Sequence, residues 1–476
     1  MKKNLLYFAL ATVIVTTSCK KDDDKNDPAP TNQNEILSGD LTTRTLDASK
    51  KYLLQGNVFV RSGQKLTIPE GTVIFGDKRT KGTLVIDEGG QIEAIGTAEK
   101  PIVFTSEQEE GERDKGDWGG IVMLGRANCN QNRPAIEGVT PEVRFGTFQS
   151  EANNTESSGT LKFVRIEFAG IALSPNNETN SLTMGGVGSG TVIENVQVSY
   201  GGDDGFEWFG GTVNGKNLVS FGTWDDDFDC DFGWSGNVQY GLAIRDPFSA
   251  DQSGSNAFEC DNDAAGNNVT PYTSGVFSNI TVLGPRMDTT NAISGNYQHA
   301  MHLRRRTAIS LFNSVVTGFP TMFRLDGLST QTQYENGVGA IEKTIIVGVA
   351  GRVRNPVTMY SGGSGNSNDT VRHFFQRAEK ANMAFNTRVS ATEASLKPDY
   401  AGMGLNENAF FTKYTRESYP KTMNMAVTSG ILSSGAVFTN AKVAGTFFDK
   451  VNHVGAFGST NWTENWTNFQ PVLQAY

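Results

Sequence analysis

The chain has 476 residues, of which 19% are charged and 37% hydrophobic, and its formal net charge is −10. This composition excludes a charge-driven disordered protein, a coiled coil and a polytopic membrane protein. The excess of acidic residues argues against nucleic-acid binding, because phosphate contacts need basic side chains. Glycine, with 53 residues, is unusually common.

The N-terminal residues predict export. Lys2 and Lys3 precede an apolar run of 11 residues, Leu5 to Val15, whereas a bilayer-spanning helix needs about 20. The pattern is typical of a signal peptide over residues 1–18. Small residues then precede Cys19, an arrangement that resembles the lipobox of bacterial lipoproteins, so we expect lipidation of Cys19. Ordinary secretion with an incidental Cys19 is the alternative.

Residues 19–40 are predicted to form a flexible tether, because the segment from Lys20 to Pro30 lacks the apolar residues needed to fold. The acidic cluster Asp22–Asp24 just after the cysteine resembles the surface-export signal of Bacteroidota lipoproteins. That resemblance implies a lipid-anchored protein in the outer membrane, exposed at the cell surface. One cysteine carrying several acyl chains is enough for stable anchoring.

Short β-rich segments recur about every 20 residues over residues 41–350, which indicates a sandwich, a barrel or a solenoid. Two columns of residues with related spacing favour the solenoid. The first column is Asn195, Asn217, Asn237, Asn279 and Asn313, and the second is Phe206, Phe228, Phe258, Met301 and Phe323. We therefore predict an all-β fold, a right-handed parallel β-helix, with the apolar column inside. The asparagines should stack at a turn and donate hydrogen bonds along the stack.

The pattern becomes less regular after residue 350. Residues 351–400 are predicted to be a helical or loop insertion, with a helix from Asp369 to Phe385. Residues 401–476 are predicted to hold the last coils and a C-terminal cap over the final coil. Such a cap is expected because the open end of a solenoid exposes unpaired strand edges.

The cysteines test the predicted register. Cys230 and Cys260 each lie two residues after a column phenylalanine, so they should stack about 4.8 Å apart, within the span of a disulfide. Because an exported chain meets an oxidising environment, we predict a Cys230–Cys260 disulfide and a free Cys129. The alternative is two buried thiols that lack the geometry for a bond.

Acidic residues concentrate between positions 203 and 263. The register places Glu207, Asp229 and Glu259 in one outward column, where stacked like charges repel. Ca²⁺ would relieve this repulsion, since it binds six to eight oxygen ligands. The predicted ligands are Asp203, Asp204, Glu207, Asp227, Asp229, Asp231, Glu259 and Asp261. Alternatively, His302, Arg304 and Arg324 neutralise the columns from within.

No catalytic residues are predicted. The sequence Gly202-Asp203-Asp204 resembles the paired-aspartate motif of polygalacturonases, but the other signatures of that family, Asn-Thr-Asp, Gly-His-Gly and Arg-Ile-Lys, are missing. One of the arginines 304–306 could supply the base of a lyase, although adjacent arginines more often form structural ion pairs. Trp224 and Trp234 flank the acidic segment and could contact a sugar or a protein partner, with core packing as the alternative.

Four segments resemble a family of Bacteroidota surface lipoproteins built on β-helix repeats. They are Gly116–Ile121, Asp204–Gly211, Asp225–Asp229 and Gly455–Trp466. Members are often encoded beside SusC/SusD-type TonB-dependent transporters. The resemblance implies a non-catalytic accessory or binding subunit of such an outer-membrane complex and carries over no catalytic residues. The alternatives are a calcium-dependent polysaccharide lyase or glycoside hydrolase, and a structural adhesin.

Overall fold

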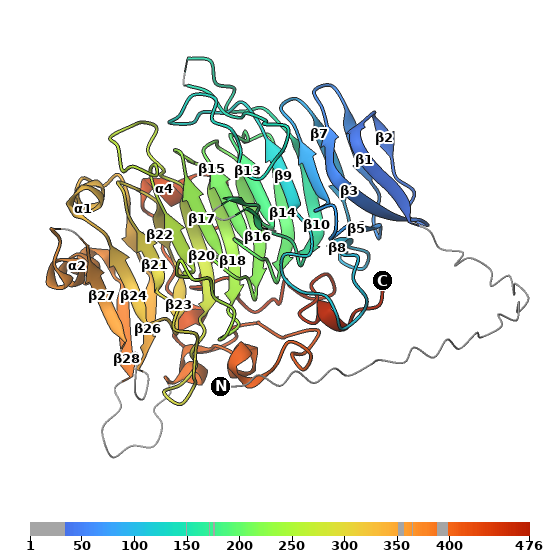
Figure 1. Ribbon diagram of the computed structural model, residues 1–476. Coiled ribbons are helices and arrows are strands. Elements are labelled where there is room, and N and C mark those ends of the chain that lie inside the picture. Colours follow the sequence, from blue (N-terminus) through green and yellow to red (C-terminus); the bar gives the residue numbers. More distant parts are fainter. Residues whose placement is uncertain are drawn as a thin grey trace, which may run out of the picture. The chain divides into compact units, whose positions relative to one another are not determined.

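The computed structural model describes residues 34–148, 150–170, 172–174, 177–350, 357–363, 365–387 and 398–476. The predicted signal peptide, Cys19 and most of the predicted tether lie outside the described residues. Residues 34–476 form one unit, a right-handed parallel β-helix whose successive turns, here called coils, stack on one another (Figure 1). In the described part of the chain, no helix has the length and apolar character to span a membrane.

Three ladders of parallel strands form the walls of the β-helix. Ladder 1 consists of β2 (Arg44–Thr45), β4 (Lys65–Ile68), β7 (Gln91–Ile95), β22 (Ser310–Phe312), β25 (Ile341–Glu342) and the first parts of five longer strands. The longer strands are β10 (Gly159–Glu167), β14 (Val192–Ser199), β16 (Asn214–Phe221), β18 (Asn237–Ile244) and β20 (Val276–Leu283).

Ladder 2 continues from ladder 1 around a corner. It contains the second parts of the five longer strands with β5 (Val73–Gly76), β8 (Ile102–Ser106), β23 (Val315–Thr317), β26 (Ile345–Val349) and β28 (Met383–Thr387). It begins with the first parts of β1 (Glu35–Leu41) and β3 (Lys51–Val60), whose second parts begin ladder 3. Because β1 starts at Glu35, the predicted tether ends earlier than residue 40.

Ladder 3 completes each coil. Its further strands are β6 (Thr83–Ile86), β9 (Gly120–Leu124), β13 (Leu182–Gly185), β15 (Phe206–Phe209), β17 (Phe228–Asp231), β19 (Phe258–Cys260), β21 (His299–Leu303), β24 (Thr321–Leu325) and β27 (Thr358–Gly362). A separate antiparallel pair is formed by β11 (Ala172–Ser174) and β12 (Asn177–Glu178).

The predicted apolar column fills the interior. Its five members, Phe206, Phe228, Phe258, Met301 and Phe323, are paired in register along ladder 3. All are buried, and the ring centroids of Phe228 and Phe258 are 5.2 Å apart. The register prediction for this column is therefore confirmed.

The corner between ladders 1 and 2 has a residue with positive φ in each central coil, a conformation that asparagine tolerates well. Asparagine occupies it at Asn195, Asn217, Asn279 and Asn313, with φ from 51° to 58°. In the intervening coil Gly241 pairs with Leu218, which places Tyr240 opposite Asn217. Tyr240 therefore takes the corner position in this coil, with φ of 64°. Asn237 lies three residues earlier in the strand, so the prediction that it joins the asparagine column is wrong.

The last 79 described residues, 398–476, form a segment that we call the C-terminal strap. It holds α3 (Tyr400–Met403), α4 (Ala441–Ala444) and short 3-10 turns at Glu407–Ala409, Phe411–Lys413, Ile431–Ser433 and Pro471–Leu473. Its apolar residues form a second core with the outer face of ladder 2, where Phe221 packs against Tyr419 and Phe469. The strap thus lies along the side of the coils (Figure 1), whereas the sequence predicted a cap over the last coil.

The strap also receives the hydrogen bonds expected within the asparagine column. Asn279 donates from Nδ2 to the carbonyl of His453 (2.9 Å), and Asn313 donates to the carbonyl of Val437 (3.0 Å). The predicted donation along the stack is therefore wrong for these two residues. Their amides satisfy the backbone of the strap instead.

The coils continue beyond residue 350 through β27 and β28, within the predicted insertion. Helix α2 (Asn368–Phe375) is shorter than the predicted helix, and its N-cap is Ser367, which accepts a hydrogen bond from the Thr370 NH. A 3-10 turn (Ala378–Lys380) then leads into β28. Phe375 packs against Phe323 and Tyr360, so α2 closes this end of the interior. The remaining helix is α1 (Leu328–Glu335), between β24 and β25.

The predicted disulfide is not formed. Cys230 and Cys260 are neighbours in register, as expected, but both are free and fully buried, as is Cys129. Residues paired in register on adjacent parallel strands project in the same direction, so their Cα–Cβ bonds run side by side. A disulfide needs the Cβ atoms to come closer together than the strands are, within about 3.5–4.5 Å.

Candidate functional site

The outer face of ladder 3 carries a column of charged side chains. Inward residues such as Phe206 alternate with outward ones such as Glu207. The observed register stacks five outward positions in the predicted order, Glu207, Asp229, Glu259, His302 and Arg324. The column is thus acidic in its first coils and basic in its last.

A second column, at the turn before ladder 3, brings further acidic groups to this face. The Oδ1 atom of Asn180 accepts from the NH of Asp204 (3.1 Å), and Oδ1 of Asp204 accepts from the NH of Asp226 (2.8 Å). Asp226 accepts in the same way from Asn256 (2.5 Å). These bonds fix the carboxylates coil by coil. Asp226 was missed as a ligand, although it precedes Phe228 by two residues, as Asp204 precedes Phe206.

Three overlapping groups of carboxylates are close enough to share a cation. In each group, one oxygen per residue lies within 4.8 Å of the others. The groups are Asp203, Asp204 and Asp225; Asp204, Glu207 and Asp229; and Asp226, Asp229 and Glu259. Sequence reasoning placed Asp225 in the cluster but did not select it as a ligand. Its Oδ1 atom is buried and has no hydrogen-bond partner.

Six of these side chains form no ion pair with a basic residue in the described structure. We call them the uncompensated carboxylates: Asp203, Asp204, Glu207, Asp225, Asp226 and Asp229. Burial and then mutual repulsion raise the pKa of Asp204, Glu207 and Asp229 well above the ordinary range. Burial, and then repulsion from Asp251 and Glu259, raises the pKa of Asp225 to about 7. A bound cation would reverse this effect by favouring the charged forms.

The basic part of the face neutralises Glu259 and Asp261. Arg304 forms an ion pair with Glu259 and donates from Nε to Asp261 (2.8 Å), while Arg305 donates to the other oxygen of Asp261 (2.6 Å). His302 Nδ1 lies 3.3 Å from Glu259. Burial favours a higher pKa for Glu259, but hydrogen bonding from His302 and the charge of Arg304 outweigh burial and lower this pKa. Basic side chains of the same face therefore neutralise these two carboxylates, as the alternative to calcium binding predicted.

Besides Asp261, two predicted metal ligands lie outside the three groups. Asp227 is fully buried, 3.1 Å from Arg245, and accepts a hydrogen bond from Ser220 (2.6 Å), so it belongs to an internal ion pair. Asp231 accepts from the Phe232 NH (2.6 Å), and burial followed by repulsion from Asp261 raises its pKa to about 8. The structure thus brings together the predicted ligands except these two and Asp261.

The two candidate tryptophans differ. Trp234 is fully buried, with its ring centroid 4.9 Å from that of Trp208, so its predicted contact with a ligand is wrong. Its indole NH donates to the carbonyl of Val213 (3.1 Å). Trp224 is partly exposed beside Asp225, and Lys115 Nζ lies 3.8 Å from its ring centroid.

Two glutamates outside the three ladders, Glu137 from a loop and Glu178 at the end of β12, add to the negative charge near the uncompensated carboxylates. Glu137 and Glu178 both raise the pKa of Asp203, after burial and Asp225. Burial and then repulsion by Glu178 raise the pKa of Glu137 itself to about 7. Neither residue was a candidate, because the loops between strands show no periodicity that would place them on ladder 3.

The fold and the acidic outer face define a class, the parallel β-helix proteins with a charged surface on one ladder. A family model described as a pectate-lyase-like β-helix domain matches residues 39–410. The chain belongs to this family. No curated protein and no solved structure shows significant similarity to it.

Proposed function

We propose that this protein binds an acidic polysaccharide through calcium held on the outer face of ladder 3. The observation that carries the proposal is the set of six uncompensated carboxylates, which together with Glu259 form three groups whose oxygens lie within 4.8 Å of one another. Ca²⁺ prefers six to eight oxygen ligands, including carboxylates. Asp204 and Asp229, each shared by two groups, are the central ligands in this proposal.

Groups around the acidic face support a polymer as the ligand. A carboxylate of the polymer would complete the coordination of calcium and pair with Arg305, whose side chain is 42% exposed. The partly exposed ring of Trp224 offers a face on which a sugar ring could stack. Trp224 directly precedes Asp225 in the chain, and Arg305 pairs with Asp261, in the basic part of the face.

The cellular setting of this binding role is also a proposal. Lipidation of Cys19 would anchor the protein in the outer membrane, with the β-helix at the cell surface. There it would act as a non-catalytic accessory subunit of a SusC/SusD-type complex. Co-purification from detergent-solubilised outer membranes, followed by mass spectrometry, tests this. Recovery of the protein without a transporter would contradict the accessory role.

A polysaccharide lyase is the second candidate function. In β-elimination a base removes a proton next to the uronate carboxylate, the glycosidic C–O bond breaks and a C=C bond forms. Arg305 is the candidate base because its side chain is 42% exposed and it pairs with Asp261 alone, whereas Arg304 is less exposed and is held by both Glu259 and Asp261. Ultraviolet absorbance of the unsaturated product from acidic polysaccharides would detect this activity, and Arg305→Ala should abolish it.

Calorimetric titration tests the calcium site. The EDTA-treated protein should bind CaCl₂ and, in its presence, an acidic polysaccharide such as polygalacturonate. Glu207→Gln and Asp229→Asn should each weaken calcium binding at least tenfold, because each removes a charged ligand. The matched control is Asp369→Asn, which changes a carboxylate that is 79% exposed on α2. Absence of calcium binding by the unaltered protein would overturn the proposal.

A further inference from the structure

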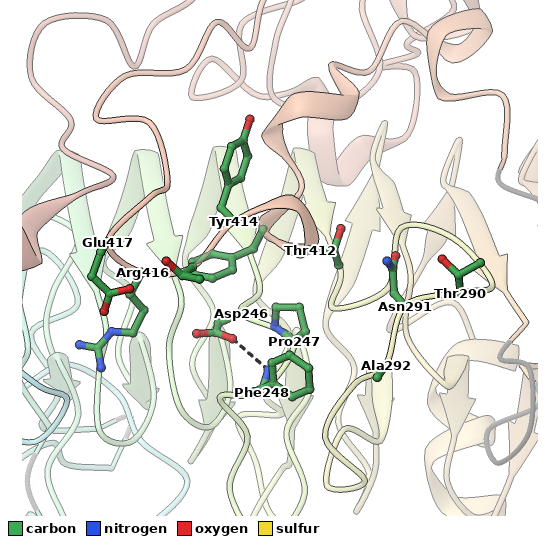
Figure 2. A pocket seen from close by; sticks show the side chains of 12 residues that line it. Asp246, Pro247, Phe248, Thr290, Asn291, Ala292, Thr412, Tyr414, Arg416 and Glu417 are labelled. Atoms are coloured by element: carbon green, nitrogen blue, oxygen red, sulfur yellow. Dashed lines mark hydrogen bonds between the residues drawn. The ribbon is translucent and has the colours of Figure 1, made fainter.

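A pocket of about 460 Å³ lies between the coils and the C-terminal strap (Figure 2). Residues 246–248 and 290–292, from two turns that follow ladder 2, form one wall, and residues 411–417 of the strap form the other. Its volume falls within the range of about 300–1,000 Å³ that is usual for small-molecule sites. The family match ends at residue 410, so the strap wall is contributed by residues outside the matched region.

Phe248 is an exposed aromatic ring on a rigid loop of this pocket. Its side chain is 68% exposed, the largest value among the large apolar residues of the described chain. Its NH donates to Oδ1 of Asp246 (2.9 Å; Figure 2), and the hydroxyl of Tyr297 lies 2.5 Å from the carbonyl oxygen of Asp246. The carbonyl of Pro247 accepts from the NH of Ser294 (2.8 Å). The backbone that carries the ring is therefore held in place before any ligand binds, which lowers the entropic cost of binding.

The charged residues of the pocket disfavour an anionic ligand. Arg416 is already engaged, since it donates to Asp114 (2.7 Å) and lies 4.6 Å from the ring centroid of Tyr200. Two carboxylates, Asp246 and Glu417, also line the pocket. Negative charge therefore prevails there, and a phosphate or uronate group would be repelled.

We propose that this pocket binds a neutral sugar unit. The C–H face of a pyranose ring would stack on Phe248, as apolar surfaces do on aromatic rings. Its hydroxyl groups would donate to the carboxylate oxygens of Asp246 and Glu417, which act only as acceptors when ionised. The lining contains none of the uncompensated carboxylates, so this binding requires no calcium.

The test uses the mature chain in EDTA, titrated calorimetrically with the hexasaccharides of cellulose, mannan, galactan and xylan. At least one should bind, and Phe248→Ala should weaken that binding about tenfold or more. Phe148→Ala, which alters a side chain that is 48% exposed outside the pocket, should leave it unchanged. Both substitutions are at exposed positions, and thermal melting checks that the variants fold.

Three results would overturn the proposal: no binding of any of the four sugars, equal binding by Phe248→Ala, or loss of binding in Glu207→Gln. The last result would place the sugar on the acidic face instead. Conversely, neutral-sugar binding that persists in Glu207→Gln, in a protein that fails to bind calcium, would support this pocket while contradicting the calcium-dependent function.

Discussion

Gln197 and Asn468 exchange two hydrogen bonds although 271 residues separate them in the chain. Gln197 donates from Nε2 to the carbonyl of Asn468 (2.9 Å), and the NH of Asn468 donates to Oε1 of Gln197 (2.8 Å). Gln239 and Asp449 repeat this arrangement with distances of 3.0 and 2.8 Å. Two side-chain amides thus take the place of a neighbouring strand and fasten the strap to the coils, Gln197 on ladder 2 and Gln239 at the end of ladder 1.

Gln197→Ala should loosen the strap. The substitution leaves the buried NH and carbonyl of Asn468 without these partners, which should lower the free energy of unfolding by about 1–3 kcal/mol. Urea unfolding measures this change, and limited proteolysis should cut the strap faster. Gln91→Ala is the matched control, because Gln91 is exposed and makes only a 3.3 Å hydrogen bond to Ser157. Equal stability of the two variants would contradict the fastening role.

Without calcium, the protein should become less stable as the pH rises. The pKa values of Asp204, Glu207 and Asp229 are raised in the folded state, so the folded state binds protons more tightly than the unfolded state. The associated stability is present below about pH 4 and is lost as the pH rises through the folded values, which for Asp225 is about 7. Thermal melts in EDTA should therefore show a higher Tm at pH 5 than at pH 8.

Saturating calcium should reverse much of that loss, because the cation stabilises the charged carboxylates. The combined variant Glu207→Gln/Asp229→Asn provides the control, since it removes two of the repelling charges. Its Tm in EDTA should depend less on pH than that of the unaltered protein. A Tm in EDTA that rises from pH 5 to pH 8 would show that folding does not raise the pKa values of these carboxyl groups.

Arg304→Gln should destabilise the basic part of the face. It removes the cation paired with both Glu259 and Asp261 and leaves two largely buried carboxylates with less compensation. Because the side chain of Arg304 is 25% exposed, we expect a loss of about 1–3 kcal/mol, below that of a fully buried pair. Urea unfolding measures it.

Adding Glu259→Gln to Arg304→Gln should restore part of the stability, because it removes one of the two carboxylates. Arg372→Gln is the control. Its partner Asp369 is 79% exposed, so this change should stay within about 0.5 kcal/mol. A loss in Arg372→Gln as large as that in Arg304→Gln would contradict the assignment of a special role to Arg304.

Thiol labelling should distinguish free cysteines from the disulfide that the sequence predicts. Cys129, Cys230 and Cys260 are buried, so none should react with iodoacetamide in the native protein. In denaturant without reductant, all three should react, as read by mass spectrometry. Labelling of Cys129 alone would show that Cys230 and Cys260 are bonded. In the exported protein, a fourth labelled site at Cys19 would contradict its lipidation.

The sequence was most informative at positions where every coil requires the same kind of residue. The interior needs an apolar residue at the same point of each coil, so the column from Phe206 to Phe323 could be aligned by spacing. The corner needs a residue that tolerates positive φ, and Tyr240 meets that need in one coil without being an asparagine. A search for asparagine alone therefore selected Asn237, three residues away.

Residues outside the repeats could not be placed in this way. The strap consists of turns and short helical segments without periodicity, and its partners on ladder 2 are hundreds of residues away in the chain. For the acidic face, the outward column followed from the register. The contribution of Asp226 depended on backbone hydrogen bonds at a turn, and that of Glu137 on the path of a long loop.

The strap has a consequence for the order in which the chain can fold. A solenoid usually grows one coil at a time, each new coil stabilised by its neighbour. Here the carbonyl of Tyr476 accepts a hydrogen bond from Lys51, and Arg113 donates to the carbonyl of Gln474 (2.6 Å). The first coils to leave the ribosome thus gain these hydrogen bonds only after the strap, hundreds of residues later in the chain, has been synthesised. Completion of the fold becomes a late event, and fraying of the early coils first requires release of the strap.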